Sequence, residues 1–277
     1  MPPEVAFGMG AAVANVAVAV LSTQLAARYP ARQLLGPLFL LNCLLVLPFA
    51  PFAAWVWTPT VILLHLGTTV ALVASSVAIW DMYDHGGAAP TVTAQSVAPL
   101  PAAILAGLLI PGSVGPVQAL AAVAVVAGVM VALRDAFGAL GRRRTTVAIL
   151  VAAIGTGVIT VFGRLLADNG AGVVEAYVVR TGLSAAACAL IFPPRDVPWR
   201  DVPRMTPRAM AITVHLVLIL LGVQGGNPAV VQTVVATGPL FVFAWDAAAH
   251  GRRPNPGLVV GAALAFAGVA LVALVPS

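Results

Sequence analysis

Stretches of about 20 predominantly apolar residues follow one another along almost the whole chain, and few charges interrupt them. Each stretch is long enough to cross a bilayer as an α-helix, in which the backbone polar groups are bonded internally. Only 8% of the residues are charged. A β-barrel is disfavoured because its strands alternate polar and apolar residues, whereas these runs are continuous. The sequence predicts an all-α integral membrane protein with ten transmembrane helices, over residues 5–27, 34–54, 60–80, 90–110, 117–133, 147–166, 173–192, 209–225, 228–249 and 258–274.

The two halves of the chain match each other without a gap across the ends of both halves. The matched positions are Pro99 with Pro239, Pro116 with Pro256, and Gly128 with Gly268. Each half then holds five spans, an odd number, so the second half must be inverted in the membrane relative to the first. We expect two inverted five-helix repeats, residues 1–138 and 139–277, within one membrane domain. Pro99 and Pro239 lie inside predicted spans, where a proline is expected to kink the helix.

The basic residues are all arginines, and they fall on alternate connections of the ten-span arrangement. Of the 14 basic residues, all but Arg164 and Arg180 lie in the connections between spans 1 and 2, 5 and 6, 7 and 8, and 9 and 10. Cytoplasmic loops carry an excess of arginine and lysine. These four connections are therefore predicted to be cytoplasmic, in a cell-membrane protein with both termini outside.

The paired segments "APLPAAILAGLLIPGSVGPVQALAAVAVVAGVMVAL" and "GPLFVFAWDAAAHGRRPNPGLVVGAALAFAGVALVAL" resemble the drug/metabolite transporter superfamily, in particular its EamA-type members. In that family, each repeat has a proline in its fourth helix, a short loop, and a fifth helix that begins at a proline. "VVEAYVVRTGLSAAACAL" (173–190) is similar to the family's second-helix pattern. The resemblance implies ten helices in two repeats and transport of small molecules. The loop glutamate common in the family is missing from both halves.

An ionisable group inside a membrane helix is costly, so it is a candidate functional residue. Arg180 lies well inside the span 173–192, and Tyr177 precedes it by three residues, on the same helix face. One interpretation is a cavity cation that holds an anionic or carboxylate group of a substrate. The alternative is a structural arginine that caps backbone carbonyls or pairs with Glu175.

Two histidines and several neutral polar residues are further candidates for a substrate cavity. His65 and His215 occupy matching places in "VILLHL" (61–66) and "AITVHL" (211–216), and each is either a pathway residue or a buried, hydrogen-bonded imidazole. The neutral candidates, for which helix packing is the alternative, are Asn15, Asn42, Gln95 and Gln232. Trp80 and Tyr83 lie near a span end and are interpreted as interfacial anchors. The two cysteines lie in apolar runs without metal-binding or redox spacing, so no metal or cofactor is predicted.

The favoured function is a secondary transporter that moves a small metabolite or drug-like molecule by alternating access around a midplane site. The partners would be this small molecule and the lipid bilayer, with no nucleic acid. An intramembrane enzyme is less favoured because the sequence has no DDxxD or HExxH pattern, and no GxxxxGK[ST] pattern provides an ATPase motor. A non-transporting membrane scaffold or subunit remains the second alternative. The substrate, the coupling ion and the oligomeric state stay open.

Overall fold

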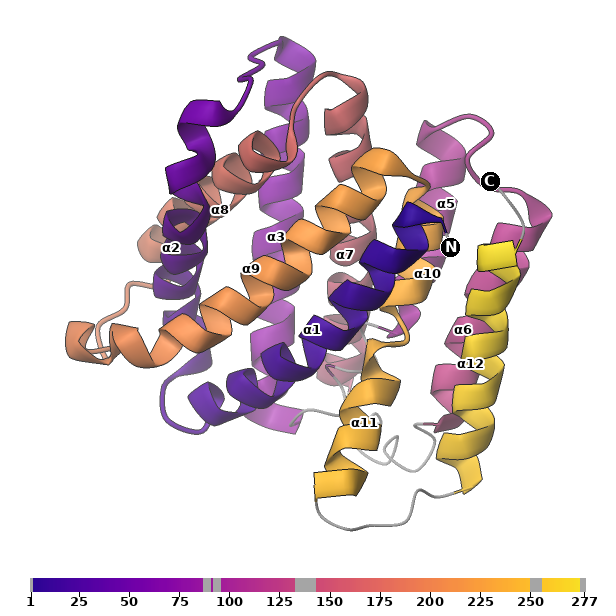
Figure 1. Cartoon of the computed structure of the whole chain (residues 1–277). Helices are drawn as coiled ribbons and strands as arrows, with labels where there is room; N and C mark the ends of the chain where they lie inside the picture. Colours follow the sequence, from indigo (N-terminus) through magenta and orange to yellow (C-terminus); the bar gives the residue numbers. More distant parts are fainter. Residues whose placement is uncertain (1, 87–90, 92–95, 133–142, 250–255, 275–277) are drawn as a thin grey trace.

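The computed structural model describes residues 2–86, 91, 96–132, 143–249 and 256–274, and every regular element in these ranges is a helix (Figure 1). The all-α prediction is confirmed for this part of the chain. The elements are α1 (Pro3–Ala26), η1 (Ala31–Leu34), α2 (Leu35–Val46), η2 (Leu47–Phe52), α3 (Pro59–Gly86), α5 (Pro99–Leu109), α6 (Pro116–Ala132), α7 (Arg143–Asp168), α8 (Val173–Ile191), η4 (Trp199–Asp201), α9 (Val202–Gly225), α10 (Pro228–Val235), α11 (Gly238–Ala249) and α12 (Pro256–Leu274).

Six helical segments of the described chain are long and apolar enough to cross a membrane. They are Pro3–Ala26, Ala31–Phe52, Pro59–Asp84, Arg144–Asp168, Val173–Ile191 and Trp199–Gly225. Four shorter apolar helical segments overlap the other predicted spans, and they are Pro99–Leu109, Pro116–Val131, Pro228–Val242 and Val259–Leu271. The length and composition of these helices are those of a multi-pass membrane protein.

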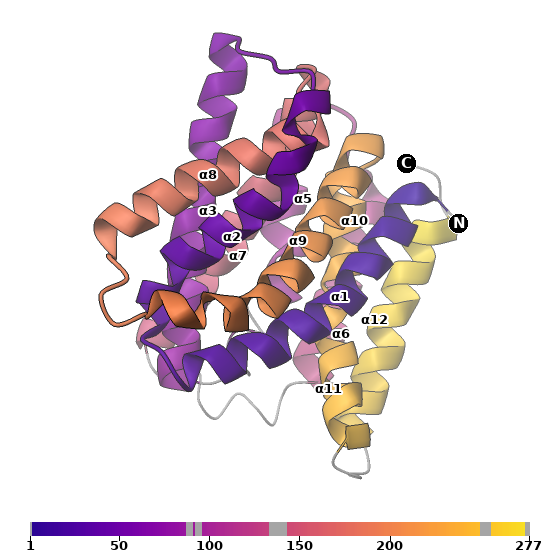
Figure 2. The same ribbon diagram turned by 60° about the vertical axis from the view of Figure 1, so that its left-hand side comes forward.

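Helices of the first half pack mainly against helices of the second half. The closest pairs are α1 with α9, α3 with α7, α2 with α8, and α6 with α12. Figures 1 and 2 show α1 and α9 crossing the molecule side by side, with α2 and α8 on one flank and α6 and α12 on the other. Hydrophobic clusters fill these contacts, and one of them joins α6, α10, α11 and α12 to the start of α1 through small side chains such as Ala121 and Ala265. The chain is therefore one interlocked bundle, in which each half completes the packing of the other.

Two glycines bring α6 and α12 into backbone contact. A Cβ atom on Gly128 would lie 2.6 Å from the backbone nitrogen of Ala265 and 2.6 Å from the carbonyl oxygen of Gly261. A Cβ atom on Gly268 would lie 2.9 Å from the carbonyl oxygen of Ala121. Gly128, late in α6, thus meets residues early in α12, and Gly268, late in α12, meets residues early in α6. The two helices are therefore antiparallel. Only residues without a side chain permit so close an approach, as at other small-residue helix contacts in membranes.

The described helices differ from the predicted spans at two proline-containing segments. α9 begins at Val202, ahead of the predicted start at 209, because Pro203 occupies the first turn, where a proline is tolerated. The predicted span 228–249 is divided into α10 and α11 by a turn at Ala236 and Thr237. Pro239 stands in the first turn of α11, and Pro99 is the first residue of α5.

Candidate functional site

A cavity of about 120 Å³ lies at the centre of the bundle, with room for several water molecules. Helices of both halves contribute to its wall: α1, α2 and α3 from the first, and α7, α8, α9 and α10 from the second. The cavity brings together several of the predicted site residues, namely Asn15, Asn42, Arg180, His215 and Gln232. Two arginines and a histidine line it, and none of the lining residues that the structure describes is acidic. The cavity is therefore cationic.

Arg180 of α8 is 1% exposed, yet its Nε and Nη2 atoms have no hydrogen-bond partner. Its guanidinium lies over the ring of Tyr177, with 5.2 Å from Cζ to the ring centroid. The Tyr177 hydroxyl in turn donates to Thr213 Oγ1 at 2.9 Å, which fixes the ring between α8 and α9. Tyr177 itself does not line the cavity but positions the side chain that does. A buried guanidinium with two free donors is ready to bind an acceptor from a ligand.

The other cavity residues are partly bonded within the protein. The Nδ1–H of His215 donates to the carbonyl oxygen of Ala11 at 2.8 Å, because a carbonyl only accepts, and Nε2 is left as an acceptor. Gln232 Oε1 lies 3.0 Å from Thr160 Oγ1. Asn42 is 1% exposed, and its Oδ1 atom has no partner. The site thus offers free donors on α8 and a free acceptor on α2.

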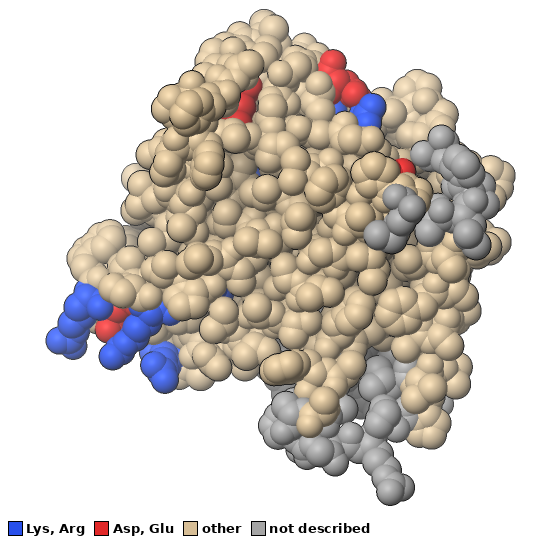
Figure 3. Space-filling view, viewed as in Figure 1, with Lys and Arg blue, Asp and Glu red and all other residues tan. Residues whose placement is uncertain are grey.

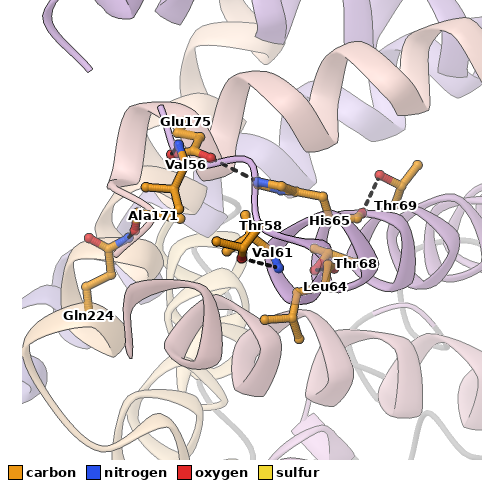
Figure 4. Close-up of polar contacts among 10 residues, drawn as sticks. All are labelled: Val56, Thr58, Val61, Leu64, His65, Thr68, Thr69, Ala171, Glu175 and Gln224. Carbon is orange, nitrogen blue, oxygen red and sulfur yellow. Dashed lines mark hydrogen bonds and ion pairs between the residues drawn. The ribbon is translucent and has the colours of Figure 1, made fainter. Parts of the chain in front are cut away.

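His65 lies away from this cavity, in a separate polar cluster near the starts of α3 and α8 (Figure 4). Its Nε2 atom lies 3.4 Å from Glu175 Oε1, and Glu175 Oε2 accepts from the backbone N–H of Val56 at 3.2 Å. Glu175 is completely buried, so this cluster uses the carboxylate considered as a partner for Arg180. The matched histidines of the two halves therefore occupy different surroundings. Gln95 lies outside the described residues.

Glu175→Ala is expected to lower the free energy of unfolding by about 1–3 kcal/mol, because it leaves the partly buried Val56 N–H without an acceptor and the buried His65 without its partner. Thermal unfolding in detergent measures this loss. Glu175→Gln serves as the control, since the amide oxygen still accepts from Val56 and the amide nitrogen donates to His65. If the alanine variant is as stable as the unsubstituted protein, Glu175 is not a structural acceptor.

Arg208, Trp80 and Ser22 are cavity residues that the sequence prediction missed. Arg208 Nε donates to Ser22 Oγ at 3.1 Å, and its Cζ lies 5.4 Å from the centroid of the Trp80 ring. Arg208 was assigned to a loop, but it lies inside α9, on the same face as His215 two turns later. Trp80 was interpreted as an interfacial anchor, but it is 2% exposed and lines the cavity. The seven-residue spacing of Arg208 and His215 was the signal available in the sequence.

A second cavity of about 80 Å³ adjoins the first and shares Arg208 with it. Arg28 and Arg204 also line this smaller cavity, which reaches toward the end of the bundle where α9 begins. At the same end, Asp81 is paired with Arg32 (3.1 Å) and Arg144 (2.6 Å). Asp81 belongs to α3, and its carboxylate joins this helix to η1 and α7. The described residues contain no group of three or more His, Cys, Asp or Glu placed to hold a metal ion.

The helices and the cavity define an all-helical, multi-pass membrane protein with a central polar site. Residues 144–274 match the model of the EamA-like transporter family, which confirms the resemblance to EamA-type members of the drug/metabolite transporter superfamily. The match indicates a transporter of drug/metabolite type and points away from an enzyme. A solved crystal structure of another protein, 16% identical, aligns over 98% of this chain and 97% of its own with a TM-score of 0.72, which supports the fold. No curated protein sequence matches the chain.

Proposed function

We propose that the protein is a secondary transporter that carries a small metabolite or drug-like molecule through the central cavity by alternating access. The observation that carries this proposal is the cavity itself: side chains from both halves line it, and Arg180 holds free donors inside the bundle. In this proposal, Arg180, Asn42, Asn15, His215 and Gln232 contact the substrate, and Tyr177 positions Arg180. Rocking of the two halves exposes the site to one side of the membrane at a time.

The proposed architecture is ten spans in two inverted five-helix repeats, residues 1–138 and 139–277. The helix pairing supports it, because α1 with α9 and α7 with α3 are equivalent pairs under a twofold operation that exchanges the halves. The contact of α6 with α12 adds support, because it is reciprocal. Gly128 meets Gly261 and Ala265, and Gly268 meets Ala121 and Val125, the residues at the corresponding positions of the other half.

The arginine-rich end of the bundle is proposed to be cytoplasmic, in the cell membrane, by the positive-inside rule. In Figure 3, basic side chains gather at the lower left, over the start of α9, and the wide middle of this face is almost free of charge. A broad uncharged band is the surface that hydrocarbon tails cover. Charged pairs such as Arg164 with Asp168 (2.9 Å) and Arg204 with Asp201 (3.2 Å) lie near helix ends, outside this band.

Single cysteines on α9 and after α7 are expected to react from opposite sides of the membrane. Arg204 and Asn169 are both exposed, and α7 carries the chain from the arginine-rich end to the other. With Cys43 and Cys188 replaced by alanine, Asn169→Cys should react with an impermeant maleimide in intact cells. Arg204→Cys should react only after permeabilisation. Labelling of both cysteines in intact cells would contradict the proposed topology.

Transport is tested by reconstituting the purified full chain in liposomes and measuring exchange across a panel of labelled organic acids, amino acids, nucleosides and cationic dyes. Exchange of at least one solute above protein-free liposomes is the expected result. If folded protein exchanges nothing on the panel, the scaffold or subunit alternative replaces the transporter. Chemical conversion of a panel compound would instead support the intramembrane enzyme.

A further inference from the structure

We propose that the central cavity selects organic carboxylates that carry no ammonium group, and that the Nε and Nη2 edge of Arg180 binds the carboxylate with two hydrogen bonds. This inference rests on the proposed function in one respect: it takes the molecule that binds in the cavity to be the molecule that is transported. Nε–H and one N–H of Nη2 point to the same side of a guanidinium, which is the edge that matches the two oxygens of a carboxylate. Both of these Arg180 nitrogens are buried and have no partner.

No carboxylate within the described part of the chain is bonded to Nε or Nη2 of Arg180. Glu175, on the same helix, is taken by His65 and by the N–H of Val56. The ring of Tyr177 lies against the guanidinium, so it holds the orientation of Arg180 without occupying the donor edge. A buried cation with unmade hydrogen bonds is unfavourable unless a ligand completes it. The arrangement is thus that of a preorganised anion site.

The balance of charge in the cavity excludes amino acids and organic cations. Arg180, Arg208 and His215 line it, and its described lining residues include no Asp or Glu. The ammonium group of an amino acid would therefore enter a low-dielectric cavity without a counter-ion and beside other cations. A carboxylate alone, or one with a neutral hydroxyl, meets no such cost.

A neutral donor next to the carboxylate has an acceptor available in Asn42 Oδ1, which is buried and unpartnered. Asn42 precedes Cys43, whose Sγ lies 3.7 Å from the carbonyl oxygen of Val178, so Asn42 and Arg180 lie at a similar level of the bundle. The rest of the wall is largely apolar, with Phe39 and Trp80 among its aromatic side chains. A hydroxy acid with an aryl or branched alkyl group matches the Arg180 donors, the Asn42 acceptor and the apolar part of the wall.

The smaller adjoining cavity provides a matching route for an anion. Arg28 and Arg204 line it, and Arg208 lies between it and the central cavity. A path lined by charges of one sign raises the local concentration of the opposite ion and speeds its entry. Arginines thus lead from the arginine-rich end of the bundle to Arg180.

The inference is tested by calorimetric titration of the purified full chain in nanodiscs of zwitterionic lipid, which present no competing anionic headgroup. The probes share one skeleton: 3-phenyllactate, 3-phenylpropionate, 3-phenylpropionamide and phenylalanine. Both acids are expected to bind at least about tenfold more tightly than the amide and phenylalanine, as charge-assisted hydrogen bonds predict. The hydroxy acid should bind more tightly than the plain acid, and Asn42→Leu should abolish that difference.

Arg180→Gln is expected to remove the preference for acid over amide. Arg180→Lys is expected to weaken acid binding at least about tenfold, because a lysine ammonium cannot offer two parallel N–H donors to a carboxylate. Arg164→Gln is the matched control, since Arg164 lies outside the cavity and is bonded to Asp168 and to the carbonyl of Gly226. Its affinities should stay unchanged. Thermal unfolding of each variant checks that it is folded.

Three results would overturn the inference: no binding of either acid at millimolar concentration, equal binding of acid and amide, or an acid preference that survives in Arg180→Gln. Selective acid binding without exchange in liposomes would leave the inference standing and refute the transporter. Exchange of other solutes without selective acid binding would support the transporter and refute the inference.

Discussion

Arg180→Met is expected to raise the free energy of unfolding by about 1–3 kcal/mol while it lowers carrier-mediated exchange at least about 100-fold. The stability gain follows because the native side chain is 1% exposed and has two donors without partners, and each such buried group costs roughly 1–3 kcal/mol. Methionine has a similar length, fits an apolar wall and removes that cost. The activity loss follows because the substrate loses its counter-ion.

Both quantities are measured on the same preparation, by chemical unfolding in detergent and by exchange in liposomes of a solute that the unsubstituted protein carries. Arg164→Met is the matched control, because Arg164 is bonded to Asp168 and to the carbonyl of Gly226. That variant should lose stability and keep its exchange within about twofold. A destabilised Arg180→Met would mean that Arg180 supports the fold rather than a ligand.

Gly128→Ala and Gly268→Ala are each expected to lower the free energy of unfolding by about 1–3 kcal/mol, the usual cost of forcing extra atoms into a packed contact. The added Cβ would lie within 2.6 Å and 2.9 Å, respectively, of backbone atoms of the facing helix, which cannot turn away as a side chain can. The two losses should agree within about 1 kcal/mol, because each glycine meets equivalent neighbours.

Gly107→Ala is the control for the intrinsic effect of alanine in a helix. A Cβ there would meet its nearest atom at 3.8 Å, an ordinary contact, so the substitution should be neutral or slightly stabilising. Chemical unfolding in detergent compares the three variants. Tolerance of alanine at both Gly128 and Gly268 would show that α6 and α12 do not rely on this backbone contact.

Much of the candidate site was predictable because polar residues are costly inside membrane helices. That argument found Arg180, Asn42 and Gln232, and the structure places all three on one cavity. It misjudged Arg208, because the four prolines before Thr206 indicate a loop, although a helix accepts a proline in its first turn, as α9 does at Pro203.

The predicted role of His65 depended on a repeat match, and such a match fixes the level of a residue along its helix but not the neighbours that surround it. His215 faces the cavity and donates to α1, whereas His65 faces Glu175. Pro239 predicted a kink in the span 228–249, but not the turn that separates α10 from α11. The run from 228 to 249 is mostly apolar, and the turn at Ala236 and Thr237 is buried by packing against other helices.

The contact of α6 with α12 has the form of an isologous interface, in which one surface pairs with its own equivalent. Gly128 and Gly268 each contact residues at equivalent positions of the facing helix, so the contact surface is nearly self-complementary. Two identical copies of either helix, antiparallel, would find the same fit. In the proposed two-repeat arrangement, joining the two halves in one polypeptide leaves each free to diverge, as the unlike surroundings of His65 and His215 illustrate.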